Sequence, residues 1–152
     1  MKIVRITVVS LLLLWFAVLV VHAAQIALKR KAAEMRTTSF LMAMQAQRFD
    51  LASERYAGEI DTERLERLHD DGFRLVSYSA VKAEYDDGCV CGGHADLTFE
   101  ANGKPLHATA VFTVGSGYRP KQVCVLTPSG SERGPIPELS EWNMLVCGGD
   151  SF

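Results

Sequence analysis

Four cysteines and one histidine are the residues best suited to chemistry in this chain of 152 residues. Cys89, Cys91 and His94 stand close together, and Cys124 and Cys147 lie further along. Thiolates and imidazoles bind zinc, and five such side chains are enough for one site. However, a Cys-x-Cys pair is tighter than the gap of about two to four residues that zinc sites usually show, and no second pair follows. We therefore expect disulfide bonds and no metal, because an even set of cysteines in an oxidising compartment usually forms bridges.

The sequence constrains the cysteine pairing only in part. A bond from Cys124 to Cys147 is the most natural choice, since it would pin the C-terminal segment to the last predicted strand and close a loop of 24 residues. The chain-entropy estimate for a loop of that length is about 3 kcal/mol. Cys89 and Cys91 would then bridge locally, or the two pairs would cross, so that all three connectivities stay open.

Catalytic signatures are weak in the rest of the sequence. His69 lies in a charged predicted helix, and His94 and His107 lie near strand starts, where solvent-facing positions are common. Residues 115–117, Gly-Ser-Gly, match neither a Gly-x-Ser-x-Gly elbow nor a phosphate-binding loop. The acidic stretch 84–87 is expected to be a solvated turn. We therefore expect no enzyme activity and no cofactor.

Charge divides the chain into two parts. Residues 1–31 carry five basic and no acidic side chains, which leaves 11 basic and 18 acidic ones, a charge of -7, for residues 32–152. Nucleic-acid binding needs clustered lysines and arginines, so an acidic head argues against it. We predict an N-terminal transmembrane anchor or signal segment over 1–31 and an extracytoplasmic head over 32–152.

A long helix is predicted to hold the head at the membrane. No glycine or proline occurs before Gly58, and these residues interrupt helices most readily. The apolar run 6–26 has 21 residues, about 32 Å of helix, which matches a hydrocarbon core of roughly 30 Å. We expect one helix that crosses the membrane and continues to about Tyr56.

A cleaved signal peptide is the alternative for the same segment. Residues 21–23 form a small-residue site, with cleavage before Ala24. Cleavage would release a secreted or periplasmic domain that binds a small ligand, or a metal through Cys89, Cys91 and His94.

The orientation follows from the cysteines more than from the basic residues. Basic side chains are nearly balanced across the apolar run, and the positive-inside rule alone leans slightly towards a cytoplasmic head. The even set of cysteines favours an oxidising compartment. We predict a single-pass protein of the inner membrane, with its head in the periplasm or outside the cell.

A sevenfold apolar repeat marks one face of the predicted helix. We expect it to be the helix-packing interface, formed by Leu28, Met35, Met42, Phe49 and Tyr56. Coiled coils and helices packed on a sheet both show such a repeat. The companion row at 39, 46 and 53 is small, which favours packing on a sheet as part of the core.

Strands are predicted after a short helix that begins at Asp61 or Thr62. Aromatic and β-branched residues indicate strands at 73–85, 96–100, 106–114 and 122–127, with a tight turn at Asn102-Gly103. An irregular C-terminal loop follows. The fold class is therefore α+β: a long N-terminal helix packed on a small antiparallel sheet.

This organisation resembles a type IV pilin or pseudopilin. The resemblance rests on the helix, on residues 44–49 (MQAQRF) followed by 54–57 (ERYA), and on the region closed by Cys124 and Cys147. It implies a membrane-anchored structural or accessory subunit of a type IV pilus or type II secretion-like assembly. Its partners would be other membrane helices or pilus and secretion subunits.

Two features depart from the pilin pattern. The chain has no glycine ahead of a prepilin cleavage site, and its first acidic residue is Glu34, beyond the anchor. Prepilin processing is therefore not expected, and the resemblance implies a pilin-like protein that stays in the membrane.

Overall fold

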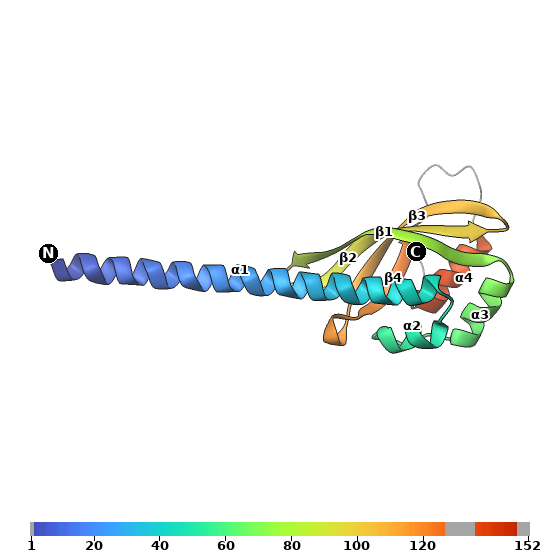
Figure 1. Ribbon diagram of the computed structural model, residues 1–152, viewed down its shortest axis with the longest axis horizontal. Coiled ribbons are helices and arrows are strands. Elements are labelled where there is room, and N and C mark those ends of the chain that lie inside the picture. The colour runs from blue at the N-terminus through green and yellow to red at the C-terminus, as the bar shows by residue number, and fades with distance from the viewer. Residues whose placement is uncertain (1, 127–135, 149–152) are drawn as a thin grey trace.

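The fold is a long helix packed on a four-stranded antiparallel sheet, as the α+β prediction requires (Figure 1). The computed structural model describes residues 2–126 and 136–148, with side chains from residue 7 onward. Its elements are α1 (Lys2–Gln45), α2 (Phe49–Arg55), α3 (Thr62–Asp70), β1 (Phe73–Asp86), β2 (Cys89–Ala101), β3 (Lys104–Val114), the 3-10 turn η1 (Ser116–Tyr118), β4 (Pro120–Leu126) and α4 (Pro137–Val146).

The N-terminal part of α1 projects away from the rest of the protein (Figure 1). The stretch Thr7–Gln45 contains an 18-residue window of mean hydropathy 2.4, and none of that window is buried. A core helix of a soluble protein would be covered by other elements, whereas this apolar window is bare. By length and composition, α1 is therefore able to cross a membrane.

The break after α1 corrects the prediction of one helix to Tyr56. The helix ends at Gln45, and Gln47 takes a left-handed conformation with φ 58°. The N–H of Arg48 then donates to the carbonyl of Ala43 at 2.9 Å, a bond typical of a Schellman C-cap. Glycine usually fills that left-handed position, and here glutamine does. The absence of glycine and proline therefore did not reveal the end of the helix.

The strands follow each other along the sheet in the order β1-β2-β3-β4. The predicted turn at Asn102-Gly103 is confirmed, with φ 53° and 75°, the left-handed pair that a two-residue hairpin of type I′ requires. Asp87-Gly88 forms the same kind of turn between β1 and β2, with φ 46° and 86°. The second strand begins at Cys89, well before the predicted start at residue 96.

One face of the sheet carries the core, and the other is polar. Phe99 of β2 stacks on Phe73 at 4.9 Å and meets Trp142 of α4 edge-on at 4.9 Å. From α1, Phe40 and Leu41 are fully buried on this face. The opposite face carries cross-strand polar pairs: Arg74 with Glu100, Thr98 with His107, and Thr113 with Gln122.

The sevenfold stripe does not pack on the sheet, which corrects the prediction. Leu28, Met35 and Met42 are 71%, 60% and 52% exposed. Phe49 and Tyr56 are buried, but they lie beyond the break, in α2 and at its C-cap. The face of α1 that packs on the head consists of Ala33, Thr37, Phe40, Leu41 and Met44. At about 3.6 residues per turn, positions 35 and 42 point away from positions 33, 37, 40 and 44.

Helix α3 begins at the predicted cap, and helix α4 lies where a loop was predicted. The side chain of Asp61 accepts the N–H of Arg64 at 3.0 Å, so the predicted cap of α3 is confirmed. The predicted C-terminal loop instead contains α4, with Pro137 in its first turn, where proline is tolerated. Other parts of that predicted loop, 127–135 and 149–152, lie outside the described residues.

Candidate functional site

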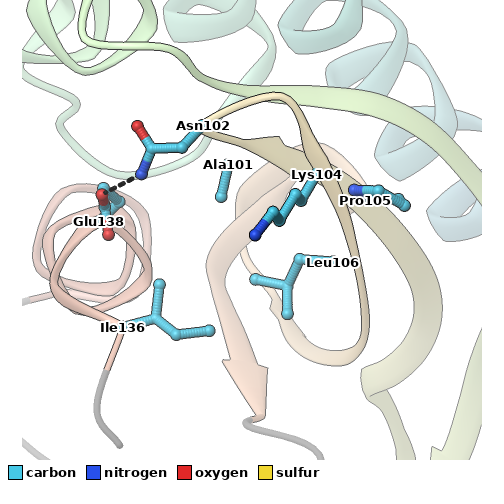
Figure 2. Close-up of a pocket in the computed structure, with 7 residues that line it drawn as sticks. All are labelled: Ala101, Asn102, Lys104, Pro105, Leu106, Ile136 and Glu138. Carbon is cyan, nitrogen blue, oxygen red and sulfur yellow. Dashed lines mark hydrogen bonds between the residues drawn. The ribbon is translucent and has the colours of Figure 1, made fainter. Parts of the chain in front are cut away.

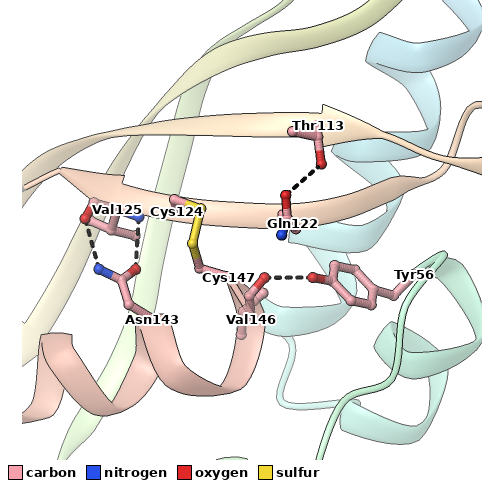
Figure 3. The surroundings of a disulfide bond; sticks show 8 residues. All are labelled: Tyr56, Thr113, Gln122, Cys124, Val125, Asn143, Val146 and Cys147. Carbon is pink, nitrogen blue, oxygen red and sulfur yellow. Dashed lines mark hydrogen bonds between the residues drawn. A yellow bond between two sulfur atoms is a disulfide. The ribbon is translucent and has the colours of Figure 1, made fainter. Parts of the chain in front are cut away.

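A disulfide joins the last strand to the end of the last helix (Figure 3). Cys124 of β4 is bonded to Cys147, the C-cap of α4, with the two Cα atoms 4.7 Å apart. This bond closes the loop that leads from β4 to α4, of which 127–135 lie outside the described residues. The position of α4 against the sheet is therefore fixed covalently at its C-terminal end.

Asn143 of α4 completes the free edge of β4. Its amide oxygen accepts the N–H of Val125 at 2.8 Å, and its amide nitrogen donates to the Val125 carbonyl at 2.9 Å (Figure 3). The side chain thus makes the two bonds that a neighbouring strand would make. Because free edges template the pairing of other chains, this contact also protects the sheet.

Tyr56 ties the chain after α2 to the end of α4. Its hydroxyl donates to the Val146 carbonyl at 2.5 Å (Figure 3), and its ring lies 5.3 Å from that of Phe40. The Val146 carbonyl belongs to the last turn of a helix, where carbonyls lack intrahelical partners. Burial raises the pKa of the Tyr56 hydroxyl, because the phenolate would lose its solvation.

Two charged side chains of α1 hold the opposite edge of the sheet at one residue. Arg30 Nε donates to the Ala83 carbonyl at 2.9 Å, and Glu34 Oε1 accepts the Ala83 N–H at 3.3 Å. Further along, Gln45 Nε2 donates to the Val76 carbonyl at 2.6 Å. These bonds fix the rotation of α1 about its axis relative to the head, beginning four residues after the apolar run.

The second disulfide lies at the start of β2, beside the turn from β1. It joins Cys89 and Cys91, with Cα atoms 5.4 Å apart. His94 contacts Glu84 at 3.1 Å across the hairpin. Within residues 2–126 and 136–148, no group of three His, Cys, Asp or Glu side chains is arranged to hold a metal ion.

The exposed side of α1 carries three large apolar side chains at sevenfold spacing with two small residues between them, and we call this row the outer-helix surface: Leu28, Ala32, Met35, Ser39 and Met42. Around Met35 it is hollowed into a groove, whose lining also includes Val81 of β1 and the charged side chains of Lys31, Glu34 and Arg36. A second groove lies on the apolar segment and is lined by residues that include Leu14, Val18, Val21 and Gln25. Since exposed apolar patches usually mark interaction sites, the three exposed apolar side chains of this row make it the candidate interaction site.

A separate pocket lies between the β2–β3 turn and the start of α4 (Figure 2). Asn102 of the turn donates to Glu138 of α4 at 3.2 Å and closes one side. The lining is mostly aliphatic, and Lys104 and Glu138 are its charged members. Figure 2 places these two side chains on different sides of the pocket.

The contacts that position the candidate site were not evident from the sequence. Asn143 and Tyr56 act through backbone atoms of residues far along the chain, and no local pattern signals such partners. The spacing of Arg30 and Glu34, one helical turn apart, was the only available sign that they act together. Comparison with protein-family models, curated proteins and solved structures finds no match to this chain.

Proposed function

We propose that this protein is a membrane-anchored, pilin-like structural or accessory subunit of a type IV pilus or type II secretion-like assembly. It acts through helix packing and a disulfide-bonded head. The observation that carries the proposal is the continuity of α1. The helix runs from a bare apolar segment into a head that covers only one of its faces. The other face exposes Leu28, Met35 and Met42, as a subunit that packs with other helices requires.

The architecture supports the comparison with pilins at the level of the fold. A long N-terminal apolar helix packs on a small antiparallel sheet, and the C-terminal region is closed by Cys124–Cys147. Two disulfides favour an oxidising compartment. The head would then lie in the periplasm or outside the cell, with α1 in the inner membrane.

The head would act as a rigid holder for the helix. Arg30 and Glu34 anchor α1 to Ala83, and Phe40 is buried against the sheet, so the helix cannot rotate freely. The outer-helix surface is thereby presented in one fixed direction. This preorganisation lowers the entropy lost when a partner helix docks.

Site-specific photocrosslinking in membranes tests the proposal. Photoreactive residues at Leu28, Met35 and Met42 should form adducts with other polypeptides. Thr37, which is buried against the head, and Arg74, on the polar face of the sheet, are the matched controls. We expect protein adducts at Leu28, Met35 and Met42 and none at the two controls. Equal yields at all five positions would contradict the proposal.

A released soluble domain is the second candidate, and one observation favours it. The contacts described between α1 and the head begin at Arg30, beyond the possible cleavage position before Ala24. Cleavage would therefore leave the head and its helix contacts intact. A metal site at Cys89, Cys91 and His94 would first need the Cys89–Cys91 bond to be reduced, because a disulfide offers no thiolate.

A further inference from the structure

We infer that the outer-helix surface selects a parallel membrane helix whose apolar seam is flanked by carboxylates, and that it disfavours a second copy of this chain. The inference rests on the proposed function and adds the chemical class of the partner. It follows from the spacing of the apolar residues on α1 and from the charges beside them.

The exposed face of α1 has the spacing of a coiled-coil seam. Its residues follow each other at alternating steps of four and three: Leu14, Val18, Val21, Gln25, Leu28, Ala32, Met35, Ser39 and Met42. This is an average period of about 3.5 residues, at which a seam keeps facing one neighbouring helix. Large side chains occupy one row of the seam. In the head the other row holds Ala32 and Ser39, which leave room for the side chains of a partner.

The flanks of the seam are basic on the head side of the apolar run. Lys29, Lys31 and Arg36 are exposed, and none of them forms an ion pair within the described part of the chain. The nearest acidic side chain on the helix, Glu34, accepts the Ala83 N–H, and Arg30 is also directed to Ala83. Of the charged side chains that line the groove, Lys31 and Arg36 are unpaired and Glu34 is bonded to the head, so the groove carries a net positive charge.

Self-association along this seam would bring like charges together. Two copies inserted in one membrane run parallel. Lys31 directly precedes Ala32, which belongs to the row of small seam residues. In a parallel coiled coil, a residue at such a position lies opposite the residue that is five places later on the other helix. Lys31 of each copy would thus meet Arg36 of the other, twice per pair. A partner with Asp or Glu at the equivalent positions replaces both repulsions by ion pairs.

A charge-reversed copy of the same chain serves as the acidic partner in the test. Full-length wild-type protein and the K31E/R36E double variant carry different mass tags and a photoreactive residue at Met35, and they are expressed together in membranes. We expect mixed crosslinks at about tenfold the yield of either like pair, because two contacts per pair change from repulsive to attractive. The matched control is K104E/K121E, with the same charge change at exposed lysines away from the seam.

The outcomes separate this inference from the proposed function. Mixed crosslinks at no more than the roughly twofold excess that random pairing gives, or the same enrichment with K104E/K121E, would overturn the charge selection. Charge-independent crosslinks to protein would leave the packing role of α1 standing. Lipid adducts alone, in every mixture, would overturn both.

Discussion

Asn143 gives the sharpest test of how the head is held together. Asn143→Ala removes both bonds to Val125 and leaves the backbone N–H and carbonyl of an edge strand without their partner. Each hydrogen bond of this kind contributes about 1 kcal/mol net, so we expect a loss of about 2 kcal/mol in the free energy of unfolding. We also expect more aggregation, since the edge of β4 becomes free to pair.

Asn143→Asp separates hydrogen bonding from packing. Aspartate has nearly the same shape, so a packing role predicts almost no loss. A carboxylate still accepts the Val125 N–H, but it cannot donate to the Val125 carbonyl and places one acceptor against another. We therefore expect Asn143→Asp to cost at least about 1 kcal/mol. Ser140→Ala, an exposed position one turn earlier on α4, is the matched control and should cost almost nothing.

Urea unfolding of the full-length protein in detergent micelles measures these changes. In a Trp15→Phe background, Trp142 is the sole tryptophan and reports on the core around Phe99. Losses below about 0.5 kcal/mol for Asn143→Ala, or equal values for Asn143→Ala and Ser140→Ala, would refute the edge-pairing argument, because surface substitutions stay within that range.

Further predictions concern Tyr56 and the two disulfides. Tyr56→Phe should cost about 1–3 kcal/mol, because it leaves the Val146 carbonyl without its donor. The raised pKa of Tyr56 means that its contribution is complete below about pH 10 and is lost as the pH rises further, since the unfolded state then releases the proton first. Urea titrations at pH 8 and above pH 10 should show that the free energy of unfolding falls less between the two pH values in Tyr56→Phe than in the wild type. Equal decreases would contradict this assignment. The double variant Cys124→Ser, Cys147→Ser should lose about 3 kcal/mol of the free energy of unfolding. The double variant Cys89→Ser, Cys91→Ser should lose about half of that, because its disulfide joins cysteines only 2 residues apart in sequence and the other joins cysteines 23 apart. Melting curves that ranked the two variants in the opposite order would show that loop closure does not dominate.

The sequence predicted the parts of the fold that local chemistry determines. The Asn102-Gly103 turn needs two left-handed residues, and the Asp61 cap satisfies a helix N–H three residues away, so both signals are local. Strand positions followed from residue type for the same reason. The start of β2 at Cys89 was missed because glycines at 92 and 93 weaken a strand pattern.

The face of α1 that packs on the sheet could not be read from the repeat alone. Two apolar faces run along this helix, and the sevenfold row at Met35 and Met42 is the more regular. The other face packs on the sheet because Phe40 and Leu41 fill the core and because Arg30 and Glu34 bind Ala83. Those partners lie far along the chain, so tertiary contacts set the rotation of the helix.

The intact mass of the protein extracted from membranes shows directly whether the N-terminal apolar helix stays on the head as its anchor. We expect a mass that includes residues 1–31, since we propose that the bare apolar helix is the anchor and it is continuous with the outer-helix surface. A mature chain that begins at Ala24, recovered without detergent, would refute the anchor and identify the protein as a released soluble domain.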